Sequence, residues 1–390
     1  MKATINIGLL AAATGLLLNS AVAQMAQEPA SAEITHQWHG PVGGLQRRPD
    51  GTSTSPNWSG YAVTGSSFTY AVGSWTVPTV NCGGSLTTYS ANWVGIDGFP
   101  STNPTVEQIG TESNCVNGVP EYYAWYEFYP EKQSRFPSLV VSAGDTISAE
   151  VRYDQANKNF YLTITDNKTG TYTTSGTAPT ALRASAEWIA EAPAKPGAKK
   201  PLPLAPFGYA SFGDDYTEVA HTCAASDSST SGPISAFRSN VNQISMEYDS
   251  TDLAVASSLS SDGSSFSVDS TAINVTNVYG LPGTANVTVL NSSGDQIYFM
   301  PIDLPYSSTN SQSTSVNLFL NTQDLTFEGS PYTLVIQATG SSGFGPGFMN
   351  FTLTSTPDLL FSNGTDSFSG LTYENQSPVT VQFSKVPLEF

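Results

Sequence analysis

The feature that most constrains this 390-residue chain is a succession of short alternating runs separated by turn residues. Apolar and polar side chains alternate in these runs, and Gly, Pro, Asn and Ser divide them. A period of two predicts β-strands, because a helix would repeat its apolar residues every three or four positions. From Asn57 the pattern is carried by NWSGYAV, FTYAVGSWTVP, SANWVGIDGF, VEQIGTE, EYYAWYEFYP, TISAEVRYD and FYLTITDNKTGTY. We therefore expect an all-β fold built as an antiparallel two-sheet sandwich or a barrel, with a hairpin at DNKTG.

A second set of alternating runs begins after Ser270, where the character of the sequence changes. These runs are AINVTNV, ANVTVLN, QIYFMPIDL, TSVNLFL, YTLVIQATG, FMNFTLT and VTVQFSK. Short strands at this spacing predict an immunoglobulin-like β-sandwich over residues 271–390. No histidine, cysteine or catalytic constellation is visible in it, so a spacer, stabilising or binding module is expected there rather than a second enzyme.

The first residues have the form of a secretory signal peptide. A lysine and an apolar run precede the small residues Ala21-Val22-Ala23, which predicts residues 1–23 as a signal and a secreted protein. No other apolar run is long enough to cross a bilayer, so we expect no membrane association. Residues 24–56 are polar and without strand or helix period, and they contain His36, His39 and Arg47-Arg48. They are interpreted either as a disordered arm or as a pro-segment whose basic groups pair with acidic groups of the mature domain and release at low pH.

The charge balance is strongly acidic, with 32 Asp and Glu against 14 Lys and Arg and a net charge of -18. This argues against a nucleic-acid partner, which requires a basic surface. In strong acid the chain can hold only its 14 Lys and Arg and 3 His charges, so self-repulsion of the protonated protein is limited and we expect tolerance of acid.

The three cysteines allow at most one internal disulfide. Cys82 and Cys115 both lie in loop-like sequence and are the preferred pair, although Cys223 could equally be a partner.

Many familiar chemistries are excluded by the residues that are missing. Once the first 56 residues are removed, only His221 remains, so a three-histidine zinc site is impossible, and HExxH is absent. There is no G-x-S-x-G elbow, no Asp-Thr-Gly signature and no phosphate-binding glycine loop. Chemistry in this chain is therefore expected to use carboxylates, amides and aromatic residues, with no metal and no cofactor.

The stretch that follows Arg183 places two carboxylates on one face of a predicted strand. Alternation puts Ala184, Ala186, Trp188 and Ala190 on one side and Ser185, Glu187, Ile189 and Glu191 on the other. Such a carboxylate could be tuned by desolvation into an acid or a base, or both could be ordinary solvated side chains.

Five ordered motifs together resemble the glutamic peptidases (eqolisins). They are NWSGY at 57–61, WVGIDG at 93–98, EQIGT at 107–111, YYAWYE at 122–127 and AEWIAE at 186–191, within a region from about Asn57 to Ser270. The resemblance implies a sandwich of two antiparallel sheets (a concanavalin-like jelly roll), secretion as a precursor, and endopeptidase activity at acid pH on protein or peptide substrates. It implies that Gln108 and Glu191 are the catalytic pair, whereas Glu187 matches a position that is not catalytic.

That pair makes chemical sense. A glutamine amide stays neutral at any pH and can donate a hydrogen bond to an oxyanion. A glutamate with an ordinary pKa of about 4.3 suits a general base working in acid. By resemblance, Trp93, Asp97, Trp125 and Glu127 are expected to bind substrate, and Asp97 or Glu127 could orient Gln108. We expect a monomer.

Two departures from the family pattern concern specificity. Fungal members carry an aspartate where Tyr123 stands, and an acidic-aromatic pair where this chain has Ala192-Pro193, so fungal cleavage preferences are not expected to transfer. The alternative from another class is a non-catalytic extracellular β-sandwich, such as a lectin-like module, which would have no need of both Gln108 and Glu191.

Overall fold

A computed structural model gives the structure of the chain, and it contains two β-sandwiches. The residues that it describes are 37, 39–48, 51–82, 87–100, 103, 105–213, 222–248, 251–270, 272–277, 283–304, 314–320, 325, 330–340, 348–356, 359–373 and 376–385. Apart from one 3-10 helix, η1 (Ile234–Asn240), the regular elements among them are β-strands. The predicted all-β class is confirmed.

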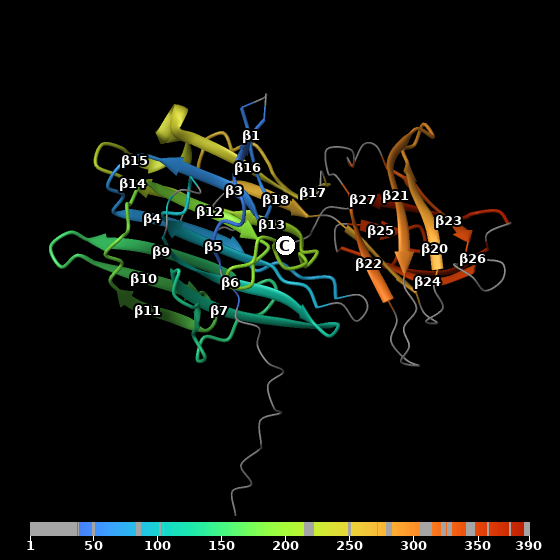
Figure 1. Ribbon diagram of the computed structural model, residues 1–390, viewed down its shortest axis with the longest axis horizontal. Helices are drawn as coiled ribbons and strands as arrows, with labels where there is room; N and C mark the ends of the chain where they lie inside the picture. The colour runs from blue at the N-terminus through green and yellow to red at the C-terminus, as the bar shows by residue number, and fades with distance from the viewer. Residues whose placement is uncertain are drawn as a thin grey trace, which may run out of the picture. The chain divides into compact units, whose positions relative to one another are not determined.

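One layer of the first sandwich, called the site sheet below, carries most of the motifs (Figure 1). Its strands pair antiparallel except for β2 with β16, which are parallel. In spatial order they are β1 (Gln46–Arg47), β2 (Ser53–Ser55), β16 (Val241–Tyr248), β3 (Trp58–Thr64), β12 (Ser185–Glu191), β5 (Ala91–Ile96), β6 (Val106–Val116), β7 (Val119–Tyr129) and β8 (Ser134–Arg135).

The other layer, the back sheet, has β4 (Tyr70–Thr76) at its centre. On one side β4 pairs with β9 (Thr146–Asp154), followed by β10 (Asn159–Asp166) and β11 (Gly170–Gly176). On the other side it pairs with β14 (Ala224–Ser226), which leads to β15 (Ser231–Pro233), and with β13 (Gly208–Phe212), which leads to β18 (Phe266–Ser270). Strand β17 (Thr251–Ala256) pairs with β16 and with β18, so it joins the two layers at one edge.

The core lies between the two sheets and is filled by alternate residues of both. In β12, Ala186, Trp188 and Ala190 belong to this core, whereas Ile189 belongs to a separate apolar cluster on the outer face of the site sheet. Opposite them, the back sheet contributes residues such as Trp75, Ile147 and Leu162. The predicted division of β12 into two faces is therefore confirmed, because alternation along a strand sends neighbours to opposite sides.

The predicted strands of the first region are present with small shifts at their ends. The hairpin at DNKTG also forms, with Asp166 opposite Gly170. The two short strands β1 and β2 were not predicted, because they lie in a segment without local periodicity. Their backbone partners come from each other and from β16, which is distant in sequence. Pairing with a distant strand therefore produces β-strands in a segment whose own sequence pattern does not predict them.

The second sandwich contains a four-stranded and a five-stranded sheet. The first sheet has the order β22 (Thr314–Phe319), β19 (Ala272–Asn277), β24 (Phe348–Ser355) and β26 (Ser367–Tyr373). The second has the order β21 (Gln296–Leu304), β20 (Gly283–Leu290), β23 (Tyr332–Gly340), β27 (Val379–Lys385) and β25 (Leu359–Phe361). Buried residues such as Val275, Val287 and Phe351 form its core. The predicted runs are all strands here, and only β25 and β26 were missed.

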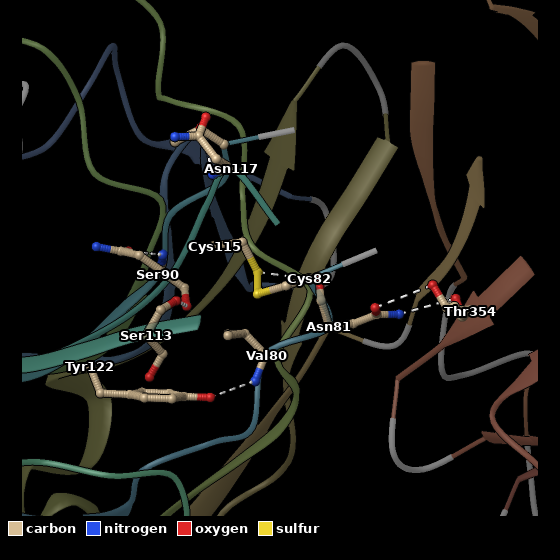
Figure 2. The surroundings of a disulfide bond; sticks show 11 residues. Val80, Asn81, Cys82, Ser90, Ser113, Cys115, Asn117, Tyr122 and Thr354 are labelled. Carbon is tan, nitrogen blue, oxygen red and sulfur yellow. Dashed lines mark hydrogen bonds between the residues drawn. A yellow bond between two sulfur atoms is a disulfide. The ribbon is translucent and has the colours of Figure 1, made fainter. Parts of the chain in front are cut away.

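A disulfide between Cys82 and Cys115 fixes the far end of β6 (Figure 2). The two Cα atoms are 5.3 Å apart, within the ordinary range for a disulfide. Near it, the Tyr122 hydroxyl accepts a hydrogen bond of 3.3 Å from the Val80 backbone N–H. The preferred pairing is therefore confirmed, and Cys223 is a buried cysteine outside the disulfide.

We predict that replacing both Cys82 and Cys115 by alanine lowers the free energy of unfolding by about 2–4 kcal/mol, because the cross-link restricts the unfolded chain. Urea unfolding at fixed pH measures this. Wild-type protein unfolded in the presence of a thiol reductant should match the variant. Equal unfolding midpoints for the variant and the oxidised wild type would contradict the prediction.

Candidate active site

The candidate site lies on the outer face of the site sheet, opposite the core. An apolar cluster covers this face and includes Trp58, Trp93, Trp125 and Ile189. All four of these side chains are fully buried. The polar residues named by the sequence motifs stand among these tryptophans.

Strand register arranges the outer face in three parallel rows across β3, β12, β5, β6 and β7. The row that contains Glu191 is Trp58, Glu191, Ala91, Glu112 and Tyr123. The row that contains Gln108 is Ala62, Glu187, Gly95, Gln108 and Glu127. The middle row is Gly60, Ile189, Trp93, Gly110 and Trp125. Trp93 and Trp125 therefore separate the two polar rows.

Gly110 in the middle row leaves the space that the neighbouring Trp93 occupies. A Cβ atom on Gly110 would lie 2.4 Å from the Asn92 carbonyl oxygen and 2.6 Å from the Trp93 Cβ, which is closer than real contacts allow. Only a residue without a side chain fits between the two tryptophans of this row.

Gln108 is held by the carboxylate opposite it. Its Nε2 donates a hydrogen bond of 2.8 Å to Glu127 Oε2. The Oε1 atom of Gln108 is buried and has no hydrogen-bond partner among the described residues. Of the two carboxylates expected to orient Gln108, Glu127 therefore does so, and the amide retains an unused acceptor.

Glu191 is fully buried and receives two side-chain hydrogen bonds from neighbouring strands and loops. Trp93 Nε1 donates to its Oε2 over 2.7 Å, and Asn57 Nδ2 donates to its Oε1 over 3.0 Å. Burial raises the pKa of Glu191, while hydrogen bonds from His39 and Trp93 oppose the rise. The interpretation of Glu187 and Glu191 as solvated side chains is wrong, since both are 0% exposed.

The segment before β1 lies against this face and contacts its aromatic and acidic side chains. The imidazole of His39 stacks on Trp125, with ring centroids 3.8 Å apart and planes 13° apart. Its Nε2 lies 2.9 Å from Glu112 Oε1, and its Nδ1 lies 3.3 Å from Glu191 Oε2. His39 itself is 0% exposed.

The backbone of the same segment is held by side chains of the site. Gln108 Nε2 donates to the His39 carbonyl oxygen, and the His39 N–H donates to Glu127 Oε2 over 3.1 Å. One residue further on, Asn57 Nδ2 donates to the Gly40 carbonyl oxygen over 2.9 Å, and Asn57 Oδ1 accepts from the Val42 N–H over 3.0 Å. Gln108, Glu127 and Asn57 thus bind main-chain groups, which every peptide possesses.

The electrostatics of the site combine one imidazole with three carboxyl groups. Burial would lower the pKa of His39, but Glu112 and Glu191 outweigh it and the pKa is raised well above the ordinary value. Burial raises the pKa of Glu127 to about 8, although His39 acts in the opposite direction. At acid pH Glu127 is therefore neutral, and the charge of Glu191 contributes to this by raising the Glu127 pKa.

Asp97 lies apart from Gln108. Its carboxylate accepts hydrogen bonds of 2.7 Å from the backbone N–H groups of Arg183 and Ala184, and one of 2.6 Å from Asn103 Nδ2. It therefore anchors the chain that enters β12, and its role in substrate binding stays a prediction.

A second group of buried carboxyls surrounds Asp97. Burial raises the pKa of Glu107 and of Glu187 well above the ordinary value, and the charge of Asp97 raises both further. Both side chains are 0% exposed. Glu187 therefore belongs to this group, whereas the charge of Glu191 acts on Glu127, whose pKa it raises.

The structure thus places Gln108, Glu191, Trp93, Trp125 and Glu127 together, as the motifs predicted. Three further residues of the site were not assigned to it. Asn57 opens the NWSGY motif, and Glu112 follows Gln108 on the same strand face by alternation, so both had a signal in the sequence. His39 was named only among the basic groups that would pair with acidic groups of the mature domain.

No group of three or more His, Cys, Asp or Glu side chains within the described ranges could hold a metal ion. In the same part of the chain, no helix is long and apolar enough to cross a membrane.

A two-sheet sandwich with a paired glutamine and glutamate on an outer, tryptophan-lined face defines the class of protein. The model of the Peptidase A4 family matches residues 56–268, and the chain belongs to this family. The resemblance to glutamic peptidases is therefore confirmed.

Several known proteins are similar to parts of the chain. Aspergillopepsin-2 from Aspergillus niger is 30% identical over 158 residues, which cover 35% of this chain and 56% of that protein. Scytalidopepsin B from Scytalidium lignicola is 37% identical over 95 residues, 24% of this chain and 34% of that protein. The chain thus spans only about a third to a half of the length of these relatives. A structure of scytalido-glutamic peptidase with a transition state analog inhibitor aligns with a TM-score of 0.46 and 25% identity, and covers 55% of this chain and 98% of that one.

The buried carboxyls predict a fold that is most stable in acid. The raised pKa values of Glu107, Glu127 and Glu187 mean that the folded state binds protons more tightly than the unfolded chain, whose glutamates titrate near about 4.3. Their contribution is therefore complete below the unfolded pKa and is lost as pH rises through the folded values, which for Glu127 means about 8.

We expect the melting temperature to be highest in acid and to fall continuously through neutral pH. Glu107→Gln and Glu187→Gln should each flatten this dependence, since an amide stays neutral, whereas Glu131→Gln on the exposed surface should leave it unchanged. Thermal unfolding measured at several pH values checks this. A melting temperature that rises from acid to neutral pH would show that these groups are not buried as protonated acids.

Proposed function

We propose that this protein is a secreted endopeptidase that hydrolyses protein or peptide substrates at acid pH, with Gln108 and Glu191 as the catalytic pair. The observation that carries the proposal is a peptide group already bound in the site. The Nε2 of Gln108 donates to the His39 carbonyl oxygen, and Glu191 Oε2 lies 3.3 Å from Nδ1 of the same histidine. Asn57 Nδ2 donates both to Glu191 Oε1 and to the carbonyl oxygen of the next residue, Gly40. A lectin-like binding protein would not need both this amide and this carboxylate at one residue of a bound peptide.

The chemistry follows from these two groups. Glu191, as a carboxylate, removes a proton from water, and the water oxygen bonds to the carbonyl carbon of the substrate. The Nε2–H of Gln108 stabilises the oxyanion, while its unpaired Oε1 can accept a hydrogen bond from the attacking water. Glu191 then donates the proton to the leaving nitrogen, and the C–N bond breaks. No covalent intermediate with the enzyme is needed.

The neighbours of the pair adapt it to acid. Glu127 is neutral at acid pH because its pKa is about 8, and its Oε2 fixes the amide of Gln108. The indole of Trp93 donates to Glu191 and favours the carboxylate over the acid. Glu191 can therefore be a base in acid although burial raises its pKa.

The remaining regions receive roles as part of the same proposal. Residues 1–23 are a signal peptide and residues 24–56 a pro-segment, which precede a peptidase domain at 57–270. The pairing of Arg48 with Glu247 over 2.7 Å and with Asp252 over 2.8 Å supports the pro-segment, as does His39 in the site. The immunoglobulin-like domain at 271–390 serves as a spacer, stabilising or binding module.

We predict that Glu191→Gln and Gln108→Ala each lower the rate of casein hydrolysis in acid by roughly a hundredfold or more, since one loses the base and the other the oxyanion donor. Glu131→Gln, an exposed position after β7, is the matched control and should keep full activity. Circular dichroism verifies folding. Near wild-type activity in either site variant would disprove the mechanism.

A second prediction concerns the acid limb of the pH profile. Trp93→Phe removes a hydrogen bond that favours ionised Glu191, so the pKa of Glu191 should rise and the acid limb of kcat/KM should move to higher pH. A pH profile of peptide hydrolysis measures it. An unchanged acid limb would mean that Glu191 is not the base.

A further inference from the structure

A second side chain of the segment before β1 is enclosed by the site, two residues ahead of His39. Gln37 is only 2% exposed, and its Oε1 accepts a hydrogen bond of 3.2 Å from the hydroxyl of Tyr123. An extended peptide directs alternate side chains to the same side, so the side chains at positions 37 and 39 both meet the outer sheet face. The face therefore contacts a peptide at more than the residue whose carbonyl Gln108 binds.

Gln133 links the contacts of these two side chains. Its Oε1 lies 3.2 Å from the His39 Nε2, and its Nε2 donates to the Tyr123 hydroxyl over 3.5 Å. The hydroxyl thus accepts from Gln133, which leaves its own proton for the side chain of Gln37. Burial raises the pKa of Tyr123 above its ordinary value, so the hydroxyl keeps this proton.

A guanidinium group lies against the ring of Tyr123. The Arg135 Cζ is 3.4 Å from the centroid of the ring, and the Arg135 Nη1 donates to Glu121 Oε1 over 3.1 Å. Strand pairing holds Arg135 there, because β8 places it opposite Trp125 on β7. A cationic side chain in the position of Gln37 would therefore meet a positive charge, whereas a neutral acceptor would not be repelled.

The carboxylate opposite Tyr123 in the strand register contacts a different part of the segment. Glu112 pairs with Tyr123 across β6 and β7, and its Oε1 lies 2.9 Å from the His39 Nε2. The acidic group thus serves the residue at position 39. The group that meets the side chain at position 37 is the neutral hydroxyl.

We propose that Tyr123, Gln133 and Arg135 form a subsite that selects substrates with a hydrogen-bond-accepting side chain, such as glutamine, at the third residue before the cleaved bond. The proposal rests on the proposed peptidase function and on a register in which Gln108 holds the cleaved carbonyl, as it holds that of His39. Leucine would leave the buried hydroxyl without an acceptor, and lysine would bring a second cation beside Arg135.

Three synthetic peptides test the selection. They share one sequence and differ only at the third residue before the cleaved bond, which is glutamine, leucine or lysine, and mass spectrometry of the products verifies the bond. The full wild-type chain is used in acid near the ordinary glutamate pKa of about 4.3. We expect kcat/KM for the glutamine peptide to exceed that for each of the others at least roughly tenfold.

Two substitutions separate the contributions of the hydroxyl and the guanidinium. Tyr123→Phe should bring the glutamine and leucine peptides to within about threefold of each other, because the donor is lost. Arg135→Gln should raise kcat/KM for the lysine peptide relative to the leucine peptide at least roughly threefold, because the repelling charge is lost. Ratios between peptides on one variant do not depend on how much of that variant is folded.

Tyr122→Phe is the matched control. Tyr122 is the neighbouring tyrosine on β7, and it packs against the core on the other face of the strand. This variant should keep the wild-type ratios among the three peptides.

The outcomes separate this proposal from the peptidase function. If the wild type hydrolyses casein and cuts the three peptides equally well, the subsite is overturned and the function stands. If Tyr123→Phe retains the wild-type preference for glutamine over leucine, other residues select the substrate and the subsite is likewise overturned. If the wild type hydrolyses neither casein nor any of the peptides, the proposed function fails, and the subsite fails with it.

Discussion

The main physical constraint on this structure is the burial of carboxyl groups on an apolar sheet face, away from water. Glu112, Glu127 and Glu191 are all 0% exposed and stand among tryptophans. A buried carboxylate is costly unless it is protonated or paired. Protons from an acidic medium can meet this requirement, and so can a cation from the protein. The His39 imidazole, between Glu112 and Glu191, is the cation that the chain itself supplies.

The sandwich makes this arrangement possible because it holds the site on strands and not on loops. Each polar residue of the face is fixed by its register with two neighbouring strands, as Gln108 is between Gly95 and Glu127. The disulfide between Cys115 and Cys82 links the end of β6, the strand that carries Gln108 and Glu112, to the loop that contains Cys82. Rigid elements can hold catalytic groups within the small tolerances that catalysis needs.

The sequence allowed much of this to be predicted, and the limits have physical causes. Alternation identified the strands and placed Glu191 on the face opposite Trp188, because a period of two is a local property. The order of strands β3, β12, β5, β6 and β7 is not local, so Glu191 opposite Trp58 and Gln108 opposite Glu127 could not be derived from spacing. The motif resemblance supplied the pair, but it could not show that the Asp97 carboxylate accepts hydrogen bonds from the backbone N–H groups of residues 183 and 184. His39 was named as a basic group that would pair with acidic groups of the mature domain, but its particular partners could not be derived, since its segment has no strand or helix period.

The acidic composition and the buried acids act in the same direction. With 14 Lys and Arg in the whole chain, the protein gathers little positive charge when its carboxyls are protonated, so acid does little to expand it. The carboxyls around Asp97 and in the site bind protons more tightly when the chain is folded, so acid also stabilises them. In the structure the same face holds the backbone of the chain's own segment, through Gln108 and Glu127 at His39. The burial of these glutamates thus accounts both for the cation placed between Glu112 and Glu191 and for the expected gain in stability in acid.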